Sequence, residues 1–402
     1  MKLELKELNS GYKISKKISR LTTKQKSVAL IALTLAVVFL ITYFASVFGV
    51  IPIEALVAKT SSKLFGDEKA FPINISTETV VNMKNLGESL LVLTDSNAVL
   101  YNSDGKQVYE SVHSFAKPAV SVNGTKAVIF DRNGTGFTLL TDKKIIMSGE
   151  AENVIISAEY GKSGNYALAV RGTKSTSTLS VFNKKSKEIF KWNCAYENIT
   201  SITLSDNGKY AGAVVFGARN GETYSGINYF GFDYKEPLNS AEITGTSPYS
   251  LEFTSSDTLT LFGDNGIFKL KKNADEYEIV SEYYTPEFNS FSCNESGDYQ
   301  LTLAKYGSSN VFSISIFNGK GKMKTEIPVE TEITSVAMSG KYIFALAENQ
   351  IMVYNRNGKK VGDIDITGKL YSIHPTDKYI FVHSLDKISR CFSYGNSSLT
   401  VS

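Results

Sequence analysis

Hydrophobic and polar positions along most of the chain follow a pattern of short strands separated by tight turns. Near-continuous runs of apolar and small residues, such as residues 211–215, alternate with turn dipeptides such as Asp104-Gly105 and Asn357-Gly358. Short runs of this kind without helical spacing are typical of strands that are covered on both faces. Asp-Gly and Asn-Gly suit the positive φ angles of two-residue hairpin turns. The pattern therefore predicts an all-β domain.

A longer repeat organises these strands. A short turn leads into a strand eight times, most clearly at residues 207–210, 296–299 and 339–342. The residues that follow the eight turns are spaced 37 to 48 positions apart and are Ser89, Lys126, Tyr166, Tyr210, Thr258, Tyr299, Tyr342 and Tyr379. A period of about forty residues with four strands per repeat is typical of a β-propeller blade. We therefore predict an eight-bladed β-propeller over residues 71–396, with seven blades as the alternative.

The last repeat has three strands, around residues 369–374, 379–383 and 388–394, and lacks an outer one. Residues 71–76, just before the first repeat, can supply that strand. Closing the ring in this way leaves no long exposed sheet edge. We therefore expect residues 71–76 to form the outer strand of the last blade.

The N-terminal part of the chain predicts a membrane anchor. No charged residue occurs from Ser27 to Ile53, and at roughly 1.5 Å per residue this segment exceeds a hydrocarbon core of about 30 Å. It is too long for the apolar region of a cleaved signal peptide. Residues 1–26 carry eight Lys/Arg and two Glu, which places them in the cytoplasm by the positive-inside rule. We therefore predict a basic cytoplasmic tail (1–26) and a single transmembrane helix, a signal anchor (27–51).

Two further short segments flank the predicted propeller. Residues 52–70 are predicted to form a juxtamembrane helix or linker, because Pro52 suits a first helical position and apolar residues then recur at helical spacing. Residues 397–402 are a short C-terminal tail. With the propeller outside the cytoplasm, the expected location is the cell membrane.

Charge and cysteine usage exclude several classes of function. The whole chain has a net charge of +3 and the first 26 residues contribute +6, so the rest carries −3. A near-neutral domain argues against nucleic-acid binding through a basic surface. Cys194, Cys293 and Cys391 are the only cysteines and show no C-x-x-C spacing, so a zinc ribbon or thioredoxin-like site is not expected.

No catalytic motif is found, so we predict no catalytic residue, no cofactor and no metal site. The three histidines are His113, His374 and His383, and no Gly-x-Ser-x-Gly elbow accompanies them. His374 and His383 lie on adjacent predicted strands, where structural histidines are commoner than a metal pair. A central channel lined by paired carboxylates or by these two histidines would instead favour a hydrolase or lyase.

The hairpin turns carry a family resemblance. Residues 101–106 and 354–359 share the pattern Tyr-Asn-x-x-Gly-Lys, which resembles the repeat of quinoprotein-like propellers and, in its period, WD40-like repeats. Trp192 is the only tryptophan, and the Gly-His and Trp-Asp dipeptides of WD40 repeats are absent. With the basic tail and anchor, the chain resembles uncharacterised membrane-anchored bacterial β-propellers, a family of unknown function. The resemblance implies a location and a shape but no activity.

Three predicted loops on one face of the propeller are longer than a hairpin requires. They cover residues 171–178, 217–225 and 306–310, and long polar loops often carry binding sites. The candidate partner-binding residues on these loops are Arg171, Lys174, Arg219, Glu222, Tyr224 and Tyr306. Neutral variation in loop length is the simpler explanation for them.

These observations favour a non-catalytic binding or scaffold module outside the cytoplasm, because no ionisable groups of a recognisable site converge in the sequence. The expected partners are the membrane, through the single-pass anchor, and a protein or a cell-wall polymer. A propeller-fold hydrolase or lyase with a channel site, and an extracellular sensor that signals through the tail, are the alternatives.

Overall fold

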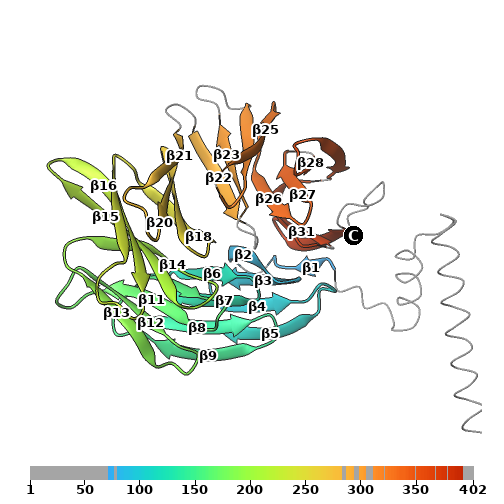
Figure 1. Cartoon of the computed structure of the whole chain (residues 1–402). Coiled ribbons are helices and arrows are strands. Elements are labelled where there is room, and N and C mark those ends of the chain that lie inside the picture. The colour runs from blue at the N-terminus through green and yellow to red at the C-terminus, as the bar shows by residue number, and fades with distance from the viewer. Residues whose placement is uncertain are drawn as a thin grey trace, which may run out of the picture. The chain divides into compact units, whose positions relative to one another are not determined.

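The computed structural model describes residues 71–392, apart from residues 77–78, 283–286, 294–297, 305–310, 321, 349, 367 and 378. The described residues form eight antiparallel sheets of four strands each (Figure 1). The predicted eight-bladed all-β propeller is therefore confirmed, and the seven-bladed alternative is wrong. The predicted tail, anchor and juxtamembrane segment lie outside the described residues. Within those residues, no helix is long and apolar enough to cross a membrane.

The blades follow one another along the chain. Blades one and two contain β2 (Val80–Leu86), β3 (Ser89–Thr94), β4 (Asn97–Tyr101), β5 (Gln107–Val112), β6 (Pro118–Asn123), β7 (Lys126–Asp131), β8 (Gly136–Thr141) and β9 (Ile145–Glu150). Blades three and four contain β10 (Ile155–Tyr160), β11 (Tyr166–Arg171), β12 (Ser177–Phe182), β13 (Glu188–Cys194), β14 (Asn198–Leu204), β15 (Tyr210–Arg219), β16 (Glu222–Gly231) and β17 (Asn239–Thr244).

Blades five and six contain β18 (Pro248–Ser255), β19 (Thr258–Gly263), β20 (Gly266–Lys271), β21 (Glu278–Glu282), β22 (Glu287–Cys293), β23 (Tyr299–Ala304), β24 (Phe312–Phe317) and β25 (Met323–Val329). Blade seven contains β26 (Ser335–Ser339), β27 (Tyr342–Leu346), β28 (Gln350–Asn355) and β29 (Lys360–Asp365). Blade eight contains β30 (Leu370–Pro375), β31 (Tyr379–Ser384), β32 (Lys387–Phe392) and β1 (Ile73–Asn74).

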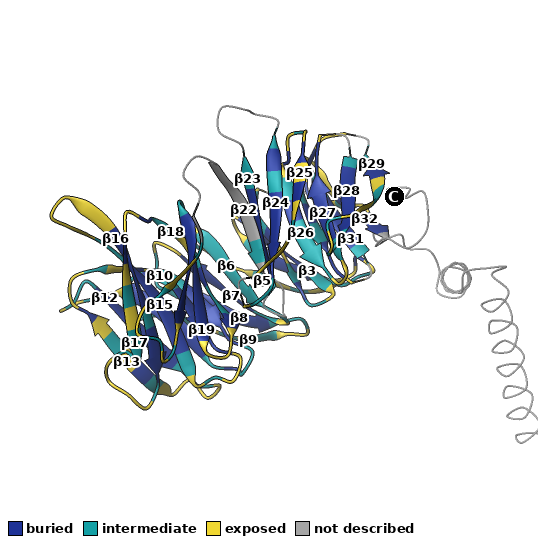
Figure 2. Cartoon of the chain, turned by 45° about the horizontal axis from the view of Figure 1, so that its top comes forward, coloured by how far each residue is buried: buried dark blue, intermediate teal, exposed yellow. Residues whose placement is uncertain are grey.

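The first strand of each blade along the chain, β30 in blade eight, lies innermost and lines a central channel. Strand β2 contacts both β6 and β30, β10 contacts β6 and β14, and β26 contacts β22 and β30. Buried residues follow most strands (Figure 2), and clusters of buried hydrophobic side chains join neighbouring blades. Val214 and Tyr229 of blade four, for example, pack against Leu251 and Phe268 of blade five. Burial against neighbours on both sheet faces explains why these strands are apolar almost throughout.

The N-terminal strand closes the ring, as expected from the sequence. Strand β1 pairs with β32, with Ile73 opposite Ile388. The Ile75 N–H extends the contact by donating to the Asp386 carbonyl at 2.9 Å. Phe71 is buried, and its ring centroid lies 5.8 Å from that of Phe381. Strand β1 therefore covers an edge of blade eight that would otherwise be open.

The recurring hairpin pattern has a local physical cause. Asn102 Oδ1 accepts hydrogen bonds from the backbone N–H groups of Asp104 and Lys106, at 3.0 and 2.9 Å. Gly105 adopts a φ angle of +79°, which favours glycine. Asn355 holds the corresponding turn of blade seven in the same way. The Asn and Gly of the motif thus fix a turn and need not have any role in binding.

Candidate binding face

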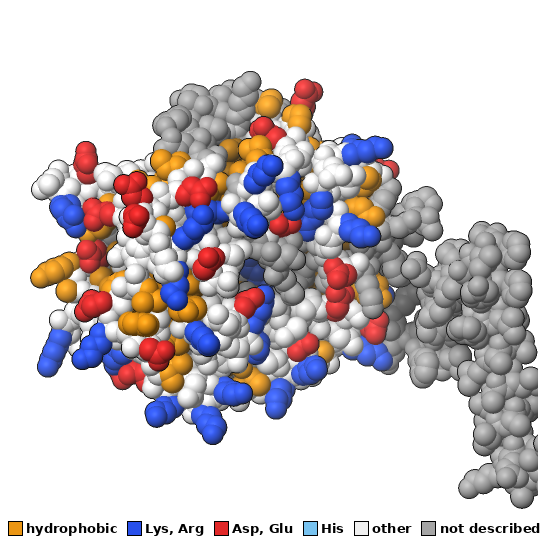
Figure 3. All heavy atoms as spheres, viewed as in Figure 1, with side chains coloured by type: hydrophobic (Ala, Val, Ile, Leu, Met, Phe, Trp, Pro, Cys, Tyr) orange, Lys and Arg blue, Asp and Glu red, His pale blue; other side chains and the backbone are white. Residues whose placement is uncertain are grey.

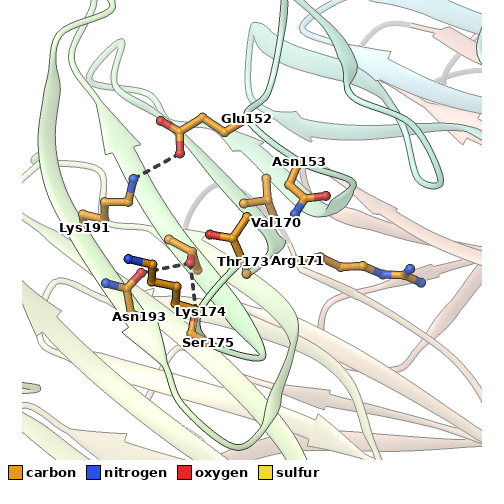
Figure 4. A pocket seen from close by; sticks show the side chains of 11 residues that line it. Glu152, Asn153, Val170, Arg171, Thr173, Lys174, Ser175, Lys191 and Asn193 are labelled. Atoms are coloured by element: carbon orange, nitrogen blue, oxygen red, sulfur yellow. Dashed lines mark hydrogen bonds and ion pairs between the residues drawn. The ribbon is translucent and has the colours of Figure 1, made fainter.

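The face that carries the longest loops is formed by the loops between the second and third strands of each blade and by the links between blades. We use the name candidate binding face for its part on blades three and four, which comprises residues 151–154, 170–178, 195–197 and 216–225. A cavity of about 290 Å³ lies there on blade three, between the loop after β11 and the link that precedes β10 (Figure 4).

Most of the residues that line the cavity are of polar types. Its lining residues are Glu152, Asn153, Val170, Arg171, Gly172, Thr173, Lys174, Ser175, Thr178, Lys191 and Asn193. Lys191 pairs with Glu152 across it at 3.2 Å, and Thr178 Oγ1 donates to Asn193 Oδ1 at 3.0 Å. Such hydroxyl and amide groups can hydrogen-bond a polar ligand, and an exposed ion pair contributes little to stability.

Two residues predicted from the sequence, Arg171 and Lys174, line this cavity together. The Arg171 guanidinium extends away from the other lining side chains in Figure 4. Neither residue forms an ion pair within the part of the chain that the structure describes. Both positive charges are therefore available to a partner. Tyr306, the candidate on blade six, lies outside the described residues.

The predicted loop over residues 217–225 is wrong, because this segment continues the hairpin of blade four. Strands β15 and β16 pair as far as Arg219 opposite Glu222. Asn220 and Gly221 form the tip with φ angles of +55° and +87°, as in the mirror-image turns of tight hairpins. The tip, where β15 ends and β16 begins, is exposed (Figure 2). The Asn-Gly pair was the signal in the sequence that could have revealed the hairpin.

Tyr224 is not the exposed loop residue that the sequence suggested. Its side chain is only 6% exposed, and its hydroxyl donates to Glu197 Oε1 at 2.8 Å. Arg219 lies over the ring, 4.9 Å from the centroid, and pairs with Glu242 at 3.3 Å. Tyr224 therefore fastens the hairpin to the link between blades three and four, whereas Arg219 and Glu222 remain exposed.

Glu197 accepts two hydrogen bonds at the base of the hairpin. Its other carboxylate oxygen, Oε2, accepts from Cys194 Sγ at 3.2 Å. Burial raises the pKa of Glu197, but the hydrogen bonds from Tyr224 and Cys194 outweigh this, and its pKa is lowered overall. The carboxyl is therefore ionised at neutral pH and acts as a fixed acceptor for Tyr224.

We expect Tyr224 substitutions to show this anchoring role. Tyr224→Phe should lower the free energy of unfolding by about 1 kcal/mol through the lost hydrogen bond. Tyr224→Ala should lower it by about 3 kcal/mol, because a buried aromatic ring is removed. Urea denaturation measures both values, and the exposed Glu222→Ala is the matched control. Equal stability of Tyr224→Ala and the control would show that the hairpin needs no anchor.

Sequence reasoning missed Tyr196, which lies beside this anchor in the link between β13 and β14. Its side chain is 89% exposed, the most exposed large hydrophobic residue in the described part of the chain. Large aromatic residues on a surface are frequent anchors of protein interfaces. A single tyrosine between two strands carries no sequence signal of exposure, because its neighbours Cys194 and Glu197 are buried or half-buried.

The second group of interest lies on the inner strands. Lys84, Glu159, Glu252 and His374 occupy β2, β10, β18 and β30. Burial, together with the nearby Glu252, raises the pKa of Glu159 to about 8. Burial also raises the pKa of Glu252 and lowers that of His374 to about 3. The channel therefore contains a pair of carboxyl groups, the feature that sequence reasoning associated with catalysis.

The two late histidines, His374 and His383, lie on adjacent strands of blade eight, β30 and β31. His374 Nε2 lies 2.9 Å from Ser372 Oγ, while His383 pairs in register with Ser372 and Ile388. Among the described residues, no group of three or more His, Cys, Asp or Glu is placed to hold a metal ion. Cys194 and Cys391 are buried free thiols.

Charged groups of both signs are mixed on one face of the propeller. Figure 3 shows Lys/Arg and Asp/Glu side chains interspersed on the visible face, which is hollowed near its centre. The described residues on this face form no basic patch of the kind that a nucleic-acid-binding domain presents.

Comparison with protein families identifies the chain at the family level. A family described as "Family of unknown function (DUF5711)" matches residues 68–389. The chain belongs to this family. The predicted membership of an uncharacterised β-propeller family is thereby confirmed, and no curated protein sequence matches the chain.

Solved structures agree with this fold. The C-terminal WD40 domain of Sif2 superposes with a TM-score of 0.57 at 14% identity, covering 79% of this chain and 97% of that one. A structure titled as the eukaryotic initiation factor gives 0.57 at 10% identity, over 81% and 87%. Sqt1 of Saccharomyces cerevisiae gives 0.53 at 12% identity, over 79% and 97%. At these identities the similarity concerns the fold alone.

Proposed function

We propose that this DUF5711 protein is a single-pass membrane protein whose propeller lies outside the cytoplasm and binds a protein or envelope partner without catalysis. The observation that carries the proposal is the candidate binding face, which combines a polar cavity, a projecting hairpin and the exposed Tyr196. WD40-like propellers with a similar fold are compatible with such a role. The charge-free segment 27–53 and the basic residues before it support the membrane location.

The experiment that tests the binding role compares substitutions on the candidate binding face of blades three and four with substitutions on the opposite face of blade four. Lys174→Glu combined with Tyr196→Ala should reduce capture of a cross-linked partner from intact cells at least tenfold, since interface hot spots often contribute about 2 kcal/mol or more. Tyr234→Ala with Lys235→Glu is the matched control, because both residues are exposed on the loop between the third and fourth strands, on the opposite face. Equal capture by both variants would place the partner elsewhere.

Membrane topology gives a separate prediction. Protease added to intact protoplasts should digest the propeller and leave the tail of residues 1–26 protected, because the basic flank keeps the N-terminus inside. Epitope tags at both termini, followed by immunoblotting, report the two fates. Complete protection of a full-length chain would contradict the proposed orientation.

Catalysis in the channel is the second candidate function, and the paired Glu159 and Glu252 favour it. A carboxyl whose pKa is raised to about 8 can serve as a general acid at neutral pH. Hydrolytic activity that Glu159→Gln and Glu252→Gln abolish, while the exposed Glu110→Gln retains it, would establish this function. If the hydrolytic activity were unchanged in all three variants, it would have to come from a contaminant.

A further inference from the structure

Most of the inner strands share a structural feature, a β-bulge, that none of the sequence motifs predicts. Six of the eight, all within the described chain, contain a β-bulge near the strand start, where the pairing with the second strand skips one residue. The bulged residues are Val81, Ile156, Thr200, Tyr249, Asn289 and Tyr371. Bulges redirect side chains and are frequent beside functional sites. Because strand starts follow the links between blades, these residues surround the channel mouth on the side of the candidate binding face.

The mouth is unusually apolar for an exposed position. Val81, Tyr249 and Tyr371 are 44%, 52% and 41% exposed. They come from blades one, five and eight, so the apolar side chains are spread around the ring. The bulged positions thus place apolar and aromatic residues at the rim of the ring, where Tyr371 lies 5.7 Å from the His383 ring and 5.8 Å from Lys369 Nζ.

A polar layer follows at a constant distance along each of these strands. Three residues after each bulge stand Lys84, Glu159, Thr203, Glu252, Ser292 and His374. Lys84, Glu252 and His374 each pair with the third residue of the next strand in their own blade, which puts them at one level of the channel. Glu159 pairs one position earlier, with Ala167. The layer therefore gathers most of the ionisable groups of the inner strands.

These groups interact across the layer. Burial lowers the pKa of Lys84, and the Glu252 charge partly offsets that effect. Glu159 Oε1 accepts from Asn123 Nδ2 at 3.2 Å, and Glu252 Oε1 accepts from Ser250 Oγ at 3.0 Å. With His374 neutral, the layer holds two carboxyl groups and only one cation, Lys84.

Two buried acceptors in the same region have no hydrogen-bond partner in the structure. They are the Ser292 Oγ atom in the layer itself and Asn85 Oδ1, which follows Lys84. Asn85 lies on the opposite side of β2 from Lys84, because successive side chains of a strand alternate, and its Nδ2 donates to the Pro375 carbonyl at 2.6 Å. A buried acceptor without a donor costs about 1–3 kcal/mol. A guest with several N–H donors and a positive charge would satisfy Ser292 Oγ and the surplus carboxyl group.

We propose that this polar layer binds an alkylammonium group, which enters through the mouth framed by Val81, Tyr249 and Tyr371. The aromatic rings attract a cation as it passes, and the glutamates pair with it inside. The group can belong to a free diamine or to a lysine side chain of a polypeptide, because both present the same chemistry. This site does not depend on the proposed partner-binding face, and either can fail without the other.

The test is calorimetric titration of the full-length protein in detergent with 1,5-diaminopentane and with Nα-acetyl-lysine amide. Saturable binding of at least one amine is expected, while the neutral 1,5-pentanediol should not bind. Binding should release protons, because the guest favours ionised carboxylates, and affinity should rise between pH 6 and pH 8. A tenfold preference for the diamine identifies a free polyamine as the guest, and the reverse preference identifies a lysine side chain.

Three substitutions distinguish an effect on amine binding from a general loss of stability. Glu252→Gln and Glu159→Gln should each weaken amine binding at least tenfold, with Glu110→Gln as the exposed control. Lys84→Met should tighten binding at least threefold, because it removes the competing cation, and a gain cannot result from unfolding. Absence of saturable binding by both amines, equal binding by Glu252→Gln, or weaker binding by Lys84→Met would overturn the proposal.

Discussion

A chain that begins at residue 79 is expected to have a free energy of unfolding at least about 4 kcal/mol lower than that of a chain that begins at residue 68. Removing one buried Phe alone costs roughly 3–5 kcal/mol. The deleted segment holds Phe71 and Ile75, both buried in the cluster that also contains Phe381 and Ile388. It also supplies β1, whose pairing with β32 covers the edge of blade eight. Residues 70–402 form a compact unit of their own, so the longer chain is the appropriate reference.

Urea denaturation of the two chains measures this difference. Phe71→Ala in the longer chain should reproduce most of this loss of stability, because the ring packs on Phe381 and lies 5.1 Å from the Arg390 guanidinium. The exposed Val112→Ala is the control for removing apolar side chains. Matching midpoints for the chains starting at residues 68 and 79 would mean that β1 covers blade eight without stabilising it.

Most of the fold could be predicted from the sequence because its signals are local. The turn that begins at Asn102 is fixed by its own side chain and by Gly105, so four neighbouring residues specify the hairpin wherever the pattern recurs. The blade count followed from the spacing of another set of turns, those that lead into the second strand of each blade. Closure by residues 71–76 could be predicted because the last repeat lacks a strand. The tail, anchor and juxtamembrane segment predicted for residues 1–70 stay predictions, because these residues lie outside the described part of the chain.

The candidate site was predicted less well because its features depend on pairing between strands. Arg171 and Lys174 line one cavity, since Arg171 ends β11 and Lys174 lies in the loop that follows. The burial of Tyr224 depends on Glu197, which lies 27 residues away in the chain. The bulges of the inner strands arise from register, and residues as different as Val81, Thr200 and Tyr249 occupy them. No composition rule could have identified the polar layer that follows.

The stability of the propeller should depend on pH through Glu159, which is only 8% exposed. Burial, with Glu252 nearby, raises its pKa from the ordinary value of 4.5 to about 8 in the folded protein. The folded state therefore keeps its proton to higher pH than the unfolded state. This group costs stability as the pH rises above 4.5, and the cost levels off above pH 8. At about 1.4 kcal/mol per pKa unit, the cost is on the order of 3 kcal/mol at pH 7.

Glu159→Gln should remove this cost while preserving the hydrogen bond, because an amide oxygen can also accept from Asn123. The variant and the wild type should be similarly stable near pH 4.5, and the variant should be more stable by roughly 3 kcal/mol at pH 7. The low pKa of His374 lowers the stability of both proteins toward acid pH. This effect is common to the variant and the wild type, so it largely cancels in the difference between them. Urea denaturation of residues 68–402 from pH 4.5 to 8, with Glu110→Gln as the exposed control, measures the difference. Parallel stability curves for Glu159→Gln and wild type would show that this carboxyl is ionised in the folded propeller at neutral pH.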